Sequence, residues 1–204
     1  MSVSASAGLV PAVSSEQDLT AAEVDQARRY LQQTHNAVVG ATKGLSDAQW
    51  HYKPAPDRWS IAENLDHIVI VMERVLGPVF EQLRTAPPPP DGFDFQAIDA
   101  IVISQFSNRL SRFNAPEVVH PVDQIAPGEL LERLAANYAR LGACLESTPG
   151  LRQHAVEALP LKALSKGAHQ FMDAYQWILA GAGHAERHAK QMLEVKAEPG
   201  FPVA

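Results

Sequence analysis

Apolar residues recur at helical spacing in four long stretches of the chain. Within each stretch they fall at intervals of three, four or seven residues, which gathers them on one face of an α-helix. No comparable alternation of apolar and polar positions indicates a β-strand. The four apolar faces are formed by Val24, Leu31, Val38 and Leu45; by Ile61, Leu65, Ile68, Met72, Val75, Val79 and Leu83; by Leu130, Leu134, Tyr138, Leu141 and Leu145; and by Ile178, Ala182, Ala185 and Met192. The pattern therefore predicts an all-α protein.

A helix start signal stands before each of the four stretches. Three are capping boxes, in which a side-chain oxygen accepts a backbone N–H and the side chain three residues later reaches back. These pairs are Thr20 with Glu23, Ser60 with Glu63, and Asp173 with Gln176. Pro127 is typical of the first turn of a helix. The signals predict four helices of roughly 20 to 25 residues, and helices of matched length bury their apolar faces most simply as a four-helix bundle.

The connections between these helices differ in length and character. The first contains a short turn at Ser46–Trp50, and the second runs from residue 85 to residue 126 and opens with Pro87–Pro90. We expect an extra short helix within it, around Ile98–Phe113. The third, Thr148–Met172, has no clear period. Residues 1–15 are mostly small and polar, and we expect residues 1–19 to form a disordered tail before a single domain at 20–204.

Composition excludes several classes of protein. The chain has 204 residues and a net charge of −6, and it has no basic cluster to bind nucleic acid. The single cysteine, Cys144, excludes a disulfide framework. The longest apolar run, Ile68–Met72, is far too short to cross a membrane, and the N-terminus lacks the pattern of a secretory signal. We therefore expect a cytoplasmic protein without nucleic-acid or membrane partners.

Two histidines on the fourth helix, His184 and His188, have the spacing of a metal site. Four residues turn a helix by about 40°, so both rings lie on one face. A catalytic zinc site needs a third ligand, and His67 on the second helix is the best candidate. A half-buried neutral histidine with a structural hydrogen bond is the alternative for His67, and His35 on the first helix could compete with it.

Other residues near the histidine pair have both functional and structural readings. Gly181 and Gly183 leave room either for a ligand or for the close approach of another helix. Tyr138 and Trp177 are expected in the core, and Cys144 is expected to be buried and inert. The remaining histidines are expected at the surface: His51, His120, His154 and His169.

Two blocks of sequence resemble the DinB-like superfamily. The segment Trp59–Ile68 resembles the start of the second helix in that family, and Tyr175–Gln191 resembles its last helix. The resemblance implies an up-down-down-up four-helix bundle, often a homodimer. It also implies a divalent metal ion, zinc or nickel, held by three histidines that correspond here to His67, His184 and His188. Some relatives transfer low-molecular-weight thiols, and many have no known activity.

A three-histidine site with an open position predicts a metal-dependent enzyme that activates water or a low-molecular-weight thiol, for hydrolysis or S-transfer on a small-molecule substrate. Glu63 is a candidate general base, although the helix cap claims the same carboxylate. Gln191 is a candidate to hydrogen-bond a metal-bound water. Arg187 either holds an anionic group or is an exposed surface residue. The alternative function is a non-catalytic bundle whose metal is structural or sensory.

Overall fold

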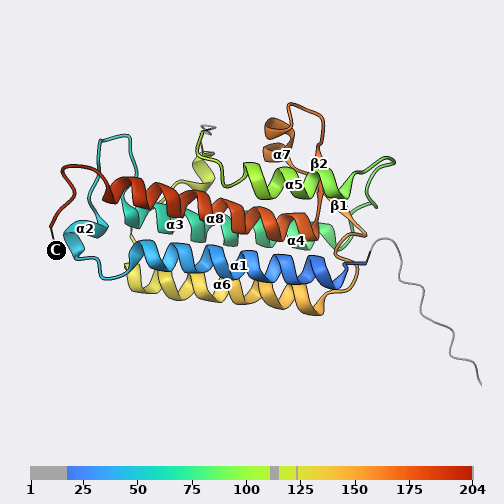
Figure 1. Ribbon diagram of the computed structural model, residues 1–204, viewed down its shortest axis with the longest axis horizontal. Helices are drawn as coiled ribbons and strands as arrows, with labels where there is room; N and C mark the ends of the chain where they lie inside the picture. Colours follow the sequence, from blue (N-terminus) through green and yellow to red (C-terminus); the bar gives the residue numbers. More distant parts are fainter. Residues whose placement is uncertain (1–17, 111–114, 123, 204) are drawn as a thin grey trace, which may run out of the picture.

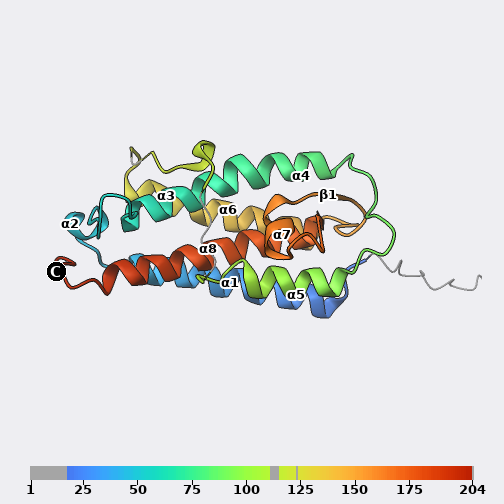
Figure 2. The ribbon, with the colours of Figure 1, turned by 90° about the horizontal axis from the view of Figure 1, so that it is seen from above.

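Four long helical rods form the body of the protein. The computed structural model describes residues 18–110, 115–122 and 124–203. The rods are α1 (Ala21–Thr42), α3 with its continuation η1 and α4 (Ile61–Val71, Met72–Leu76 and Gly77–Leu83), α6 (Pro127–Ser147) and α8 (Ala174–Lys196). α1 and α8 run in one direction, and α3–α4 and α6 run in the other (Figures 1 and 2). α1 packs against α6 and α8, and α3 packs against the same two helices. The all-α fold and the up-down-down-up order are confirmed.

The predicted start signals are present in the folded chain. The side chains of Thr20, Ser60 and Asp173 each accept a hydrogen bond from the backbone N–H three residues later, and the reciprocal bond is present in each case. Pro127 is the first residue of α6, where its missing N–H costs nothing. Local sequence thus sets where each rod begins, and with it the height of every side chain along the bundle.

The second rod contains a turn of π-helix that its apolar pattern does not reveal. η1 (Met72–Leu76) joins α3 to α4 without a break in direction (Figure 2). Pro78, at the start of α4, has no N–H to donate to the carbonyl of Arg74. The loss of that bond accounts for the irregular turn directly before it.

The connections carry more structure than their sequence indicates. α2 (Asp47–Trp50) fills the predicted turn. The extra helix is α5 (Phe95–Gln105), which Asp94 caps through Ala97 N–H. The predicted extent to Phe113 is wrong, because α5 ends at Gln105, although residues 111–113 lie outside the described part. A 3₁₀ turn, η2 (Glu117–Val119), follows.

The third connection contains a small hairpin. β1 (Ala155–Glu157) pairs antiparallel with β2 (Phe171–Asp173), with Ala155 opposite Asp173, and α7 (Leu159–Leu164) lies between them. Strands of three residues are too short to show a period in the sequence. The hairpin leads directly into α8, so it fixes the entry of that helix.

The glycines of α8 serve close packing. A Cβ at Gly181 would lie 2.6 Å from Leu76 Cδ1, and one at Gly183 would lie 3.0 Å from Phe106 Cβ and 3.2 Å from the Tyr30 hydroxyl. Of the two readings offered by the sequence, the close approach of neighbouring elements is therefore the one that the structure supports.

Two expectations concern regions beyond the bundle. Of the tail predicted for residues 1–19, residues 1–17 lie outside the described part of the chain. Among the described residues, no helix combines the length and the apolar character needed to span a membrane.

Candidate metal centre

His67, His184 and His188 meet between α3 and α8. One ring nitrogen from each lies within 4.8 Å of the other two. The antiparallel course of the two rods brings His67, near the start of α3, beside the second half of α8. His67 and His188 are 3% and 6% exposed, whereas His184 is partly exposed. His184 is therefore the most exposed of the three residues.

The spacing of the rings fits a metal ion. His67 Nε2 and His184 Nε2 are 3.2 Å apart. Two nitrogens at tetrahedral positions around zinc, with bonds of about 2.0–2.1 Å, lie about 3.3 Å apart. The ring centroids of the three pairs are 4.6 to 5.0 Å apart. The residues present thus fit a three-nitrogen site for a divalent ion.

Two of the rings are held from behind by hydrogen bonds. His67 Nδ1 lies 2.6 Å from the carbonyl oxygen of Val119 in η2. A carbonyl only accepts, so Nδ1 carries the proton and Nε2 presents its lone pair to the cluster. His188 Nδ1 lies 2.9 Å from Asn64 Oδ1, on the face of α3. Such outer contacts orient histidine ligands in metal proteins.

Burial keeps all three rings neutral. It lowers the pKa of His67 despite the opposing hydrogen bond to Val119. It lowers the pKa of His184 to about 3, with further contributions from His67 and from the Arg187 charge. It lowers the pKa of His188 well below its ordinary value. Neutral imidazole is the form that binds metals, so the cluster is ready for a cation at neutral pH.

Trp59 and a segment of the second connection form the walls of the cluster. The Trp59 ring stacks on His188 at 5.9 Å and lies 4.7 Å from His67, measured between centroids. The His120 ring meets the same indole edge-on, with 6.3 Å between ring centroids. We call residues 118–122 the covering segment. It is held to α3 by Val119 O and by Val122 N–H, which donates to Asp66 Oδ2 at 2.7 Å.

The two residues predicted to act in catalysis make structural contacts. Glu63 accepts from Ser60 N–H at 2.7 Å and from Lys53 Nζ at 2.6 Å. Gln191 accepts from Arg109 Nη1 at 3.1 Å through Oε1. These contacts account for both side chains without a substrate, and the catalytic roles of Glu63 and Gln191 stay predictions.

The reading of Arg187 as an exposed surface residue is wrong. Arg187 is buried, and its Nη1 donates to the carbonyl of Asn108. Burial and the charge of Arg109 lower its pKa. A cationic side chain therefore lies inside the molecule, close enough to lower the pKa of His184 and of His188. Its sequence position between the two histidines gives no sign of this burial.

The other histidines lie outside the cluster. His35 packs on Tyr138, with 4.8 Å between ring centroids, and so does not compete with His67. His51 and His120 are exposed, as expected. His154 and His169 are half-buried, because His154 Nδ1 bonds Ala86 O and the backbone of His169 bonds Ser165 Oγ.

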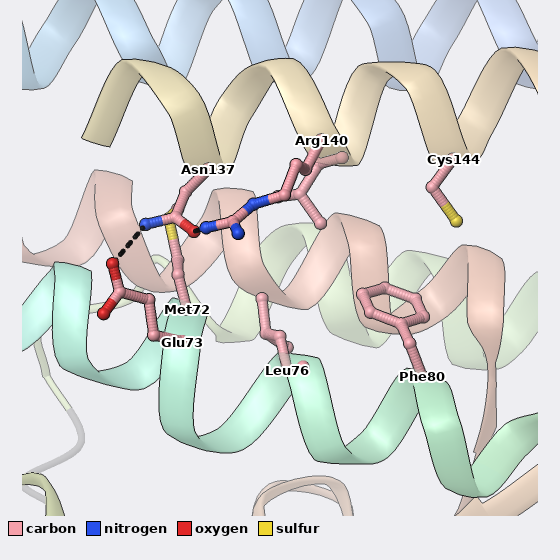
Figure 3. Close-up of a pocket in the computed structure, with 9 residues that line it drawn as sticks. Met72, Glu73, Leu76, Phe80, Asn137, Arg140 and Cys144 are labelled. Carbon is pink, nitrogen blue, oxygen red and sulfur yellow. Dashed lines mark hydrogen bonds between the residues drawn. The ribbon is translucent and has the colours of Figure 1, made fainter. Parts of the chain in front are cut away.

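Tyr138 and Trp177 lie in the core, as predicted. Cys144 does not: it is half-buried and lines a pocket of about 420 Å³ between α4 and α6. Phe80 lies at the same end of this pocket, and polar side chains lie at the other (Figure 3). There Glu73 accepts from Arg133 at 2.5 Å and from Asn137 at 3.4 Å, so these groups satisfy one another.

Sequence reasoning missed the residues that surround the three ligand candidates. Trp59 and Asn64 stand within the block that resembles the family, yet neither was assigned a contact with the histidines. Asn64 precedes His67 by three residues, and this spacing is a usable signal for a shared helix face. The carbonyl of Val119 has no such signal, because any residue supplies one.

Comparisons with known proteins agree with the fold and the site. The chain is 27% identical over 155 residues to the uncharacterized protein YuaE of Bacillus subtilis (strain 168). The aligned region covers 76% of this chain and 87% of YuaE. No solved structure matches the chain. The sequence model of the DinB superfamily matches residues 30–192, a span that includes α3, most of α8 and all three clustered histidines, and the chain therefore belongs to the DinB superfamily.

Proposed function

We propose that the protein is a divalent-metal-dependent enzyme whose ion is held by His67, His184 and His188. The observation that carries this proposal is the convergence of three neutral ring nitrogens within 4.8 Å, two of them only 3.2 Å apart. Three protein ligands leave at least one coordination position for another molecule. Zinc and nickel both suit imidazole ligands.

A bound divalent ion supplies one kind of chemistry here: it lowers the pKa of a water or thiol at its open position, which makes a nucleophile available at neutral pH. The chain's own residues supply the surroundings. Trp59 packs against His67 and stacks on His188, the covering segment bonds His67, and a small molecule would enter beside His184, the most exposed of the three residues. The substrate would undergo hydrolysis or S-transfer from a low-molecular-weight thiol.

The charge near the site favours a substrate with an anionic group. Arg187 is buried beside the histidines, and Arg109 lies close to Arg187. A metal ion adds further positive charge at the same place. Arg109 is balanced by its ion pair with Glu194 at 2.8 Å, so an anionic substituent on the substrate would gain from the ion and from the Arg187 charge in a region of low dielectric.

Metal analysis of protein purified without a histidine tag tests the proposal. After reconstitution with Zn²⁺ or Ni²⁺ and removal of free ion, we expect about one ion per chain. We expect His184→Ala to lose the ion and His35→Ala, outside the cluster, to keep it. Occupancy far below one ion in the wild type would overturn the proposal.

A second measurement separates a catalytic ion from a structural or sensory one. Cobalt(II) in the site gives a visible spectrum that reports its ligands, and a thiol that binds at the open position adds a sulfur-to-metal band. We expect this band on titration with low-molecular-weight thiols, together with turnover in a thiol-conjugation screen. A cobalt(II) spectrum that does not change when thiols or anions are added would identify the ion as structural.

A further inference from the structure

The amide of Asn64 connects the start of α3 to a ring on α8. Asn64 is fully buried, and its Nδ2 lies 2.8 Å from the carbonyl oxygen of Ser60, one turn earlier. Its Oδ1 lies 2.9 Å from His188 Nδ1. Ser60 is also the N-cap residue of α3, and its hydroxyl accepts Glu63 N–H. The side chain therefore has one fixed anchor and one partner on the facing helix.

The anchor determines which way round the amide lies. The Ser60 carbonyl accepts hydrogen bonds and cannot donate, so the group facing it is the NH₂ of Asn64. The oxygen must then face His188. An amide oxygen also only accepts, and His188 Nδ1 must therefore carry a proton. In a neutral imidazole this leaves the lone pair on Nε2, the atom that faces away from Asn64.

We infer that Asn64 is a positioning residue, which fixes His188 in the tautomer and ring orientation that present the Nε2 lone pair to the cluster. The Val119 carbonyl fixes the tautomer and ring orientation of His67 in the same way. His184 is the ring left to adapt. Because His67 is protonated on Nδ1, the 3.2 Å contact between the two Nε2 atoms requires a proton on His184 Nε2, and this proton must move to Nδ1 or to solvent before the Nε2 lone pair can bind a cation. Two rings are preset and the third responds.

Asn64 sets the tautomer of His188 whether or not an ion binds. Only the expected effect on metal affinity rests on the proposed function. The tautomer is a property of the metal-free protein, whereas the affinity for an ion follows from it. Outer-shell partners of this kind change metal affinity by about 10- to 100-fold in other proteins. A test of the tautomer can therefore contradict the role of Asn64 without contradicting the metal site, and a test of metal binding can contradict the site without contradicting the tautomer.

Ring ¹⁵N spectra of the metal-free wild type give the first test. Protonated and unprotonated ring nitrogens have well-separated shifts, and His188→Gln assigns the signals. We expect Nδ1 of His188 to be protonated and Nε2 to be unprotonated. The reverse pattern overturns the inference, even where the wild type binds one ion per chain as proposed.

Variants of Asn64 give the second test. We expect Asn64→Leu to weaken Zn²⁺ binding by about 10- to 100-fold, and Asn64→Asp, which still accepts from Nδ1 but loses the bond to the Ser60 carbonyl, to weaken it less. Thr42→Val is the matched control, because Thr42 is equally a buried polar residue but bonds only Val38 O and Val39 O. Folded Asn64→Leu with wild-type affinity and an unchanged His188 tautomer overturns the inference. If Asn64→Leu does not fold, the ring ¹⁵N spectrum of the wild type still shows which nitrogen of His188 carries the proton.

Discussion

Two buried polar clusters lie at different heights of α8, and they are built from opposite kinds of groups. At the start of the helix, Arg152 is surrounded by carboxylates: Glu23 at 2.6 Å, Asp99 at 2.7 Å and Asp173 at 2.9 Å. Farther along, His67, His184 and His188 bring one ring nitrogen each within 4.8 Å of the other two. The first cluster is completed by the chain itself. The second gathers one kind of ligand atom, and its natural complement is a cation.

A structural cluster contains its own counter-charges, whereas a binding cluster gathers ligand atoms of one kind. The Arg152 cluster joins α1, α5, the third connection and the cap of α8, and its guanidinium also lies over the Tyr175 ring at 4.5 Å. Removing Arg152 leaves Asp99 and Asp173 without a counter-charge. The histidines are neutral, so replacing one of them leaves no unpaired buried charge. We expect stability to depend on the first cluster and ligand binding on the second.

The largest expected effect is on stability. Arg152→Met leaves Asp99 and Asp173 without their cation in a buried setting, and we expect a loss of about 3 to 5 kcal/mol in the free energy of unfolding. Urea denaturation measures it. The control is Arg28→Met at the exposed ion pairs with Asp25 and Glu146, where we expect a loss below about 1 kcal/mol. Equal losses in both variants would remove the structural role assigned to the Arg152 cluster.

The histidine cluster should show the reverse behaviour. We expect His184→Gln to change the unfolding free energy of the metal-free protein by less than about 1 kcal/mol, because a neutral, partly exposed ring is replaced. In the wild type, Zn²⁺ at 100 times its Kd should add about 2.7 kcal/mol, and in the variant it should add almost nothing. Thermal melts with and without Zn²⁺ measure both effects. Stabilisation of the variant by the ion would place the metal elsewhere.

Acid should weaken the fold through the histidines. Their pKa is lower in the folded state than the unfolded value of about 6.5, so the unfolded chain binds more protons below that pH. Their contribution is complete above pH 6.5 and falls as the pH drops toward the folded pKa, which is about 3 for His184. The slope is roughly 1.4 kcal/mol per pH unit for each such ring. Urea denaturation of metal-free protein between pH 7 and pH 5 measures it, and a His184→Gln profile as steep as the wild type would contradict the assignment.

The smallest expected effect concerns the glycines that hold α8 in place. Gly181→Ala puts a Cβ 2.6 Å from Leu76 Cδ1, and we expect it to destabilise the protein by about 1 to 2 kcal/mol. Gly142→Ala, in the middle of α6 with no atom within 4 Å of the added Cβ, should stabilise it by about 0.5 to 1 kcal/mol. Thermal melts compare the two. Stabilisation by both substitutions would mean that Leu76 moves aside freely.

The sequence predicted the frame and the ligand candidates because both depend on local patterns. Capping boxes at Thr20, Ser60 and Asp173 mark helix starts through contacts three residues apart, and His184 and His188 share a helix face by spacing alone. No spacing joins His67 to α8, so its candidacy depends on its position on the second helix and on the family resemblance.

What surrounds the site could not be predicted in the same way. Arg187 is buried because the segment after α5 supplies a carbonyl at Asn108, and Cys144 is half-exposed because a pocket lies between α4 and α6. Both facts depend on how distant segments pack. The sequence does not predict the hairpin of β1 and β2, because strands of three residues are too short to show an alternating pattern.

The carbonyl of Val119 has a consequence that extends beyond the ring it orients. Because the covering segment bonds both His67 and Asp66, occupancy of the cluster by a cation and the seating of that segment are reciprocal: each strengthens the other by the same free energy. A cleavage in the second connection that released Val119 would therefore loosen the ion from a distance in sequence of some fifty residues. Conversely, a loaded centre would protect that stretch of backbone from proteases and from hydrogen exchange.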